Sequence, residues 1–287
     1  MNNGLIDDLK YKVFRSGNPI FLYIGLNAVI FIVTALLGVL LFLSGNGSGG
    51  LSGFIGEYFG FPADVTALPT RFYTLLTYMF FHDNFFHVLF NMLWVYWLGQ
   101  IFMNFMNTRQ FHFVYLAGGI CGAILFTAAF YAFPVFRPAV PTAYLIGSSA
   151  AVVAIVTATA TLVPDYEIRM LFLGNVKLKY LALAYILLSL IGVGSANAGG
   201  NIAHLGGALF GFAYIKLLRS GTDWSNLFKK KPKLKVVKNK AYNPSSSKSG
   251  SAIAQSEIDA ILDKISKSGY DKLSKEEKET LFKASNH

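Results

Sequence analysis

Four polar side chains stand inside otherwise apolar stretches of this sequence, and together they could hydrolyse an amide bond. They are Ser149, His204, His87 and Asn91. A serine hydroxyl becomes a useful nucleophile only when a base removes its proton, and His204 is the available base. The resulting oxyanion needs donors, which His87, Asn91 and the peptide N–H of Ser149 at a helix N-terminus can supply. No carboxylate is placed to orient the histidine, so the pattern predicts a dyad rather than a triad.

The spacing of His82, His87 and Asn91 distinguishes an oxyanion site from a zinc site. His87 and Asn91 are four residues apart, so one helix presents both on the same face. His82 and His87 are five apart, which on a helix points them about 140° from each other and does not give the i, i+4 pair of a zinc protease. No metal and no cofactor are therefore expected. We predict His82 at the outer rim, in a supporting role.

The elements that position these residues must lie in a membrane. Hydrophobic residues make up 54% of the 287 positions and charged residues only 14%, which is too apolar for an ordinary soluble domain. Apolar runs near or somewhat below the roughly 20 residues that cross hydrocarbon predict an all-α membrane protein, a bundle of six transmembrane helices. The predicted helices cover about residues 19–43, 84–106, 111–133, 149–163, 178–193 and 203–218.

The second, fourth and sixth of these helices run in the same direction, which brings their polar residues to a similar depth. The fourth helix covers only about 22 Å of a core roughly 30 Å thick, so Ser149 at its start lies below the outer surface. His204 precedes Lys216, near the inner end of its helix, by 12 residues. We therefore expect the four polar residues in one pocket that opens to the outside and holds water or pairing partners.

The formal net charge of +10 reports orientation rather than nucleic-acid binding, because Lys and Arg gather on alternate connections between the helices. Both termini are expected in the cytoplasm and the loops 44–70, 134–147 and 194–202 outside, in a multi-pass protein of the plasma (inner) membrane. The first apolar run lacks a small-residue cleavage site and should remain in the protein. His112 is predicted as an anchor at the inner interface. The single cysteine, Cys121, excludes an internal disulfide.

Composition changes after the last apolar run. The basic stretch "KKKPKLKVVKNK" should be attracted to anionic lipid headgroups, and the linker "NPSSSKSGSA" follows it. Capping-box spacing at Ser256/Asp259 and Ser274/Glu277, with Gly269 between, predicts two short helices, whose partner the sequence does not name. The expected divisions are a cytoplasmic N-terminal segment, the six-helix domain, a basic juxtamembrane linker and a soluble helical tail, at residues 1–18, 19–220, 221–250 and 251–287.

Three motifs occur in one order along the chain: "HxxxxHxxxN" from His82 to Asn91, "GxS" at Gly147 and Ser149, and "AHxxGxxxG" from Ala203 to Gly211. With these motifs, residues 15–220 resemble the rhomboid intramembrane serine proteases. The resemblance implies that Ser149 is the nucleophile, that His204 is the general base, and that His87 and Asn91 donate to the oxyanion. It also implies that the substrates are single-pass membrane proteins cut near the outer face.

The sequence departs from the family pattern at two places. Ala150 follows the serine where glycine is commonest, and a methyl group there could crowd the nucleophile turn. The Trp-Arg pair of the first outer loop aligns with Tyr73 and Thr74, while Arg71 is nearby but out of register. The second departure concerns loop stability or the admission of substrate rather than the catalytic groups.

Other interpretations of the same residues remain. Ser148 and Ser149 could be small residues for close helix packing, as Gly207 and Gly211 are expected to be, and His204 could be a structural hydrogen-bonding group. A rhomboid-like protein that binds membrane clients without cutting them is the alternative function, although this chain keeps both serine and histidine. A transporter is the third class, but no buried acid for ion coupling is seen.

Overall fold

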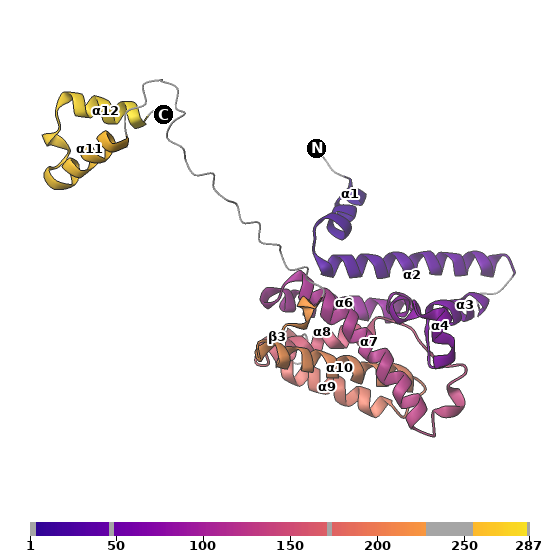
Figure 1. Cartoon of the computed structure of the whole chain (residues 1–287). Coiled ribbons are helices and arrows are strands. Elements are labelled where there is room, and N and C mark those ends of the chain that lie inside the picture. Colours follow the sequence, from indigo (N-terminus) through magenta and orange to yellow (C-terminus); the bar gives the residue numbers. More distant parts are fainter. Residues whose placement is uncertain (1–3, 46–48, 171–173, 228–254, 286–287) are drawn as a thin grey trace. The chain divides into compact units, whose positions relative to one another are not determined.

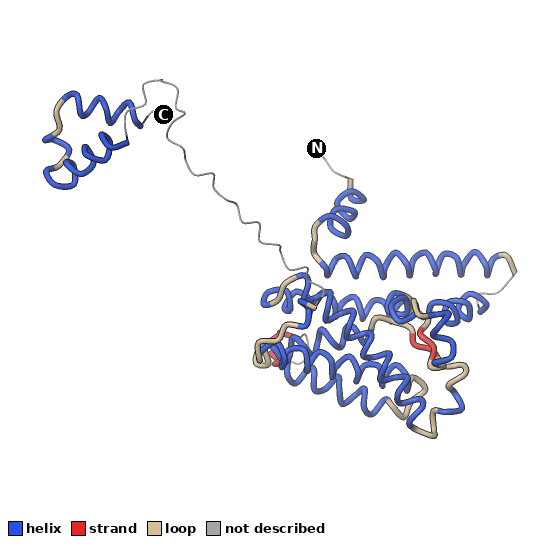
Figure 2. The backbone as a smooth tube through the Cα atoms, in the orientation of Figure 1, coloured by secondary structure: helices blue, strands red, loops and turns tan. Residues whose placement is uncertain are grey.

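The structure, a computed structural model, describes residues 4–45, 49–170, 174–227 and 255–285. The chain divides into two compact units, residues 1–230 and 231–287. Regular structure in both is mostly helical (Figures 1 and 2). The predicted basic stretch at 229–240 and the linker at 243–252 lie outside the described residues, so the structure does not test them.

All six apolar runs form helices. By length and composition, four helices in the described part of the chain could each cross a membrane: α2 (Pro19–Leu43), α6 (Phe85–Phe105), α7 (Thr108–Ala132) and α10 (Ala198–Arg219). Two shorter apolar helices are α8 (Ser149–Leu162) and α9 (Leu178–Gly192). The bounds of α2 are as predicted, whereas α10 begins five residues before the predicted start at 203.

Asparagine side chains fix where three of the long helices begin. The side chain of Asn18 accepts from the N–H of Ile20 at the start of α2, and that of Asn84 accepts from the N–H of His87 at the start of α6. A capping box between Asn107 and Gln110 starts α7. Each cap satisfies a backbone donor that the helix itself leaves free. The cap at Asn84 also fixes the helical position of His87.

The core of the first unit forms around α8, in which every residue from Ala150 to Ala160 is buried. Helices α7 and α10 pack against it and against each other, and small residues let the backbones come close. A Cβ at Gly207 would collide with the carbonyl of Ala150, and one at Gly211 with that of Ala154. The close approach predicted for these two glycines is therefore confirmed.

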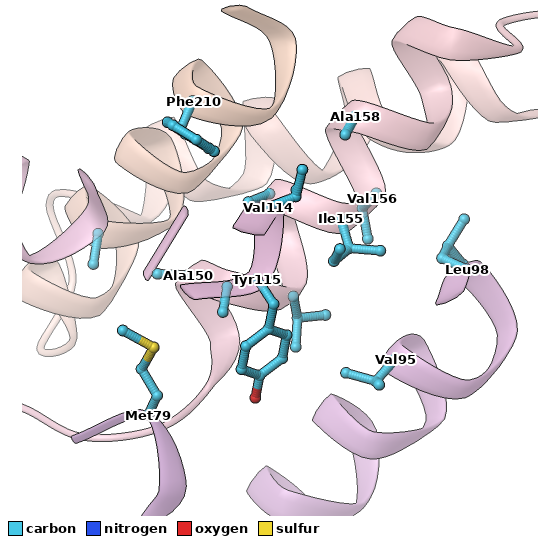
Figure 3. Close-up of a cluster of buried hydrophobic side chains, with 14 of the residues drawn as sticks. Met79, Val95, Leu98, Val114, Tyr115, Ala150, Ile155, Val156, Ala158 and Phe210 are labelled. Carbon is cyan, nitrogen blue, oxygen red and sulfur yellow. The ribbon is translucent and has the colours of Figure 1, made fainter. Parts of the chain in front are cut away.

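Larger apolar side chains complete this core. Figure 3 shows residues of α6, α7, α8 and α10 together with Met79 from the turn before α6. The labelled helical residues are Val95, Leu98, Val114, Tyr115, Ala150, Ile155, Val156, Ala158 and Phe210. By contrast, α2 packs on α6 and leaves most of its apolar surface exposed, as a helix in contact with lipid would.

Short elements join the helices on the predicted outer side. They are α3 (Gly49–Phe59), β1 (Phe61–Pro62), α4 (Leu68–Arg71), α5 (Thr74–Thr77) and β2 (Tyr144–Leu145). β1 pairs antiparallel with β2, and this connects the first outer loop to the strand just before α8. Arg71 donates to the Glu57 carbonyl at 2.8 Å and to its carboxylate at 3.1 Å, with the guanidinium 5.4 Å from the centre of the Tyr58 ring. Arg71 thus holds α3 and α4 together from its shifted position.

On the predicted inner side, α1 (Leu5–Lys10) and a π-helical turn at Tyr11–Arg15 precede α2. The antiparallel strands β3 (Glu167–Met170) and β4 (Gly174–Lys177) lie between α8 and α9. Near them Asp165 accepts hydrogen bonds from Lys179 and Lys177, which lower the pKa of that carboxyl below its ordinary value.

The second unit contains α11 (Gln255–Ser268) and α12 (Lys275–Ser285), so both predicted tail helices are confirmed. Gly269 ends the first at φ +83°. The Ser274/Glu277 capping box forms, with N···O distances of 2.7 and 3.2 Å. The box predicted to begin α11 at Ser256 is wrong, because the helix already includes Gln255.

Candidate active site

Helix α6 presents two of the predicted polar residues from its first two turns. His87 is half-buried, and Asn91 has only 5% of its surface exposed. The amide nitrogen of Asn91 makes no hydrogen bond to any described residue. A buried donor without a partner is costly, and this one belongs to a residue that lines a pocket.

The turn before α8 contacts α6 directly. Gly147 has φ +110°, and a Cβ there would lie 2.6 Å from Cε1 and Nε2 of His87. Glycine is therefore required twice, by the backbone conformation and by the imidazole that lies against it. The N–H of Gly147 donates to the carbonyl of Tyr78 at 2.8 Å, which ties the turn to the segment before α6.

His82 is buried, and its contacts agree with the supporting role predicted for it. Only 8% of its surface is exposed, and Nε2 is 3.3 Å from the Ser148 hydroxyl and 3.4 Å from the Ser148 peptide nitrogen. Because α6 starts at Phe85, His82 belongs to an extended segment and not to the helix. The 140° separation from His87 therefore does not apply, and the two rings meet edge to face at 4.9 Å. His82 supports the residue immediately before the predicted nucleophile.

Ser149 and His204 come from α8 and α10, the two helices whose backbones approach at Gly207. Ser149 is the first residue of α8, so its N–H belongs to the end of the helix that carries free donors. His204 lies one turn before Gly207 on α10. The close packing of the two helices holds both residues at the same end of the bundle.

His204 has contacts that the sequence analysis did not single out. Its Nδ1 atom is 3.3 Å from the hydroxyl of Ser189, which is buried in α9. The ring of Tyr185, one turn earlier in α9, meets the imidazole edge to face at 5.6 Å. A signal was present, since Ser189 interrupts an apolar run and lies four residues after Tyr185, but nothing in the sequence links either residue to His204.

One pocket of about 590 Å³ brings the four predicted residues together. Ser149, His204, His87 and Asn91 all line it, with Tyr185 and Trp94 among the apolar walls. Neither His82 nor His112 belongs to this lining; His112 instead lies 3.1 Å from the Tyr23 hydroxyl. The pocket lining therefore includes a hydroxyl, an imidazole and further donors, the groups that acyl transfer needs.

The family model of the Rhomboid domain matches residues 69–221, more than half of the chain. The chain belongs to the rhomboid family. Rhomboid proteins are generally serine intramembrane proteases, and this chain is an integral membrane protein. A second family model, of a family of unknown function (DUF6576), matches residues 249–287. No curated protein matches the chain.

The departure from the rhomboid pattern at position 150 is accommodated by packing. Ala150 is 1% exposed and is not part of the pocket lining. A Cβ at Gly122 of α7 would be 2.6 Å from the Ala150 methyl group. The Ala150 methyl group therefore occupies the space that Gly122 leaves by having no side chain. It does not crowd the pocket.

Proposed function

We propose that the chain is an intramembrane serine endopeptidase that hydrolyses peptide bonds in or near transmembrane segments through a Ser149–His204 dyad. The observation that carries this proposal is the single pocket lined by Ser149, His204, His87 and Asn91. The Asn91 amide nitrogen supports it further, because it has no partner in the described part of the chain and an enzyme of this kind needs a donor that is free until the oxyanion forms.

The reaction follows from the roles of these groups. His204 removes the proton of the Ser149 hydroxyl, and the oxygen attacks the peptide carbonyl of the substrate. The oxyanion of the tetrahedral intermediate accepts hydrogen bonds from the Asn91 amide, the His87 imidazole and the N–H of Ser149. His204 then gives its proton to the leaving amine, and water, activated by the same imidazole, hydrolyses the acyl-enzyme.

The substrates would be single-pass membrane proteins, and the setting a membrane crossed six times. The two shorter apolar helices, of 14 and 15 residues, would be the fourth and fifth spans. Their length is below that needed for a full span, which leaves room for water above Ser149. The Lys and Arg distribution supports cytoplasmic termini and the plasma (inner) membrane. In this proposal residues 19–220 are the protease domain, and residues 1–18, 221–250 and 251–287 are appended segments.

The test uses purified full-length protein in detergent with a generic single-span substrate. Cleavage should be lost in Ser149→Ala and in His204→Ala. It should be retained in Ser220→Ala and His112→Ala, which remove the same side-chain types away from the pocket. Equal cleavage in all variants would reject the dyad. Binding of substrate without cleavage by the wild-type protein would favour the client-binding alternative.

A further inference from the structure

The imidazole of His204 can work as a base only if the correct nitrogen is unprotonated. A neutral histidine carries its proton on one ring nitrogen and accepts on the other, and the partner of each nitrogen decides which form is present. In this protein the Nδ1 atom is next to the Ser189 hydroxyl at 3.3 Å. The other nitrogen, Nε2, has no hydrogen-bonding partner among the described residues, so it is the nitrogen left for the proposed action on Ser149.

We propose that Ser189 is the third member of the catalytic group, a positioning residue that accepts a hydrogen bond from Nδ1–H of His204 and so keeps Nε2 unprotonated. This inference rests on the proposed function, because it assigns a role within the same site. It gives to a neutral hydroxyl the position that a carboxylate holds in a serine–histidine–aspartate triad.

Burial and geometry support this role. Ser189 is 3% exposed, and it is the one hydrogen-bonding partner of the His204 imidazole in the described part of the chain. The Tyr185 ring adds a second contact from the same face of α9, four residues earlier. Two side chains of one helix thus hold the ring, one at an edge and one at Nδ1.

The proposed catalytic cycle requires the Ser189 hydroxyl to accept a hydrogen bond from Nδ1–H of His204. When His204 takes the proton of Ser149 on Nε2, both ring nitrogens carry protons, and Nδ1–H must find an acceptor. The Ser189 oxygen can accept there, with its own proton turned away, because a hydroxyl has one donor and two acceptor sites. The proton on Nε2 then passes to the leaving amine while Nδ1–H stays with Ser189, so the ring returns to the form in which it began.

The most direct test is the tautomer of His204. Full-length protein labelled with ¹⁵N-histidine is studied by NMR, and the His204 signals are identified by their loss in His204→Ala. Wild-type protein should show Nδ1 protonated and Nε2 unprotonated. Ser189→Ala should increase the Nε2–H form, and Ser189→Thr, which keeps the hydroxyl, should restore the wild-type pattern. An unchanged tautomer in Ser189→Ala would overturn the inference, whether or not the protein cleaves any substrate.

Kinetics on the same variants give a second readout. Ser189→Ala should lower kcat about tenfold and leave KM within about twofold, since one transition-state interaction is lost. Ser189→Thr should recover most of the rate. Leu188→Ala, which removes a 69% exposed side chain from the neighbouring position of α9, should match wild type. An equal loss in Ser189→Ala and Leu188→Ala, with Thr giving no recovery, would reduce Ser189 to a packing residue.

Discussion

Two groups of polar residues near opposite ends of α10, those of the pocket and those around Asp223, differ in how fully they are hydrogen-bonded. At the predicted outer end, His204 has one hydrogen-bonding neighbour among the described residues, and the nearby Asn91 amide has none. Beyond the inner end, Asp223 follows the helix and accepts hydrogen bonds from the groups around it. Tyr214, Gln110, Asn226 and the N–H of Ser225 donate at 2.9 to 3.2 Å, and Arg109 lies 3.6 Å away.

This difference distinguishes polar groups that stabilise the fold from polar groups that remain available for a reaction. The hydrogen bonds around Asp223 join residues at the inner ends of α7 and α10 and fix these ends against each other. Of the pocket groups near the outer end, His204 has one partner and the Asn91 nitrogen none among the described residues, which costs stability and leaves hydrogen-bonding capacity in the pocket. Helix α10 joins the two ends, with its glycines packed on α8.

The largest effect should come from breaking the packing that both ends share. A valine at Gly207 would collide with the carbonyl of Ala150 and force α10 away from α8. We expect Gly207→Val to lose more than about 100-fold of cleavage and to lower the thermal midpoint strongly. Gly53→Val is the control, because a Cβ there meets nothing within 4 Å. Similar behaviour of both variants would contradict the close approach.

A change confined to the outer end should affect the rate and not the stability. Asn91→Ala removes a donor proposed for the oxyanion, and kcat should fall about 100-fold. The thermal midpoint should stay within about 2 °C, because the amide nitrogen has no hydrogen bond to a described residue that the change would remove. Unfolding measured by tryptophan fluorescence, beside the cleavage assay, checks both quantities. A large drop in the midpoint with an unchanged rate would make Asn91 a structural residue.

The matching change at the inner end should do the reverse. Asp223→Asn weakens hydrogen bonds to a charged acceptor, and the thermal midpoint should fall by about 5 °C. At a temperature where both proteins are folded, kcat should remain within about twofold of wild type. Asp8→Asn, at an exposed position of α1, serves as the control. A selective loss of kcat in Asp223→Asn would mean that the two ends are coupled.

The smallest effect is a pH dependence at the inner end. Burial tends to raise the pKa of Asp223, but hydrogen bonds from Ser225, Tyr214 and Gln110 outweigh it and leave that pKa below the ordinary value. A lowered folded-state pKa stabilises the fold above the unfolded value, about 3.9, and this stabilisation is lost as pH falls through the folded value. The midpoint difference between wild type and Asp223→Asn should therefore shrink between pH 6 and about pH 3. A constant difference would contradict the charge-dependent role.

Local signals in the sequence account for most of the fold. Apolar run length predicted the helices, and α2 has the predicted bounds, because Asn18 and Pro19 form a start signal that acts within a few residues. The Ser274/Glu277 box was equally local. The predicted start of α10 was late because its first turn contains two glycines, Gly199 and Gly200, which weaken a helix pattern and are held here by packing.

Only the site residues that belong to sequence motifs could be predicted. His87, Asn91, Ser149 and His204 stand at spacings that a sequence displays, and all four line the pocket. The contacts of Ser189 with His204 and of His82 with Ser148 join residues that are 15 and 66 positions apart. Such contacts depend on how helices pack, so no local pattern indicated them, and the helical spacing applied to His82 was misleading.

The most direct test of the account is covalent labelling of the nucleophile. Purified protein is treated with a fluorophosphonate, which reacts with activated serines, and the modified residue is mapped by mass spectrometry. The account predicts one label on Ser149 in wild-type protein and almost none in His204→Ala, because the hydroxyl is activated by that imidazole. Labelling of another residue, or equal labelling of Ser149 in both proteins, would contradict the dyad.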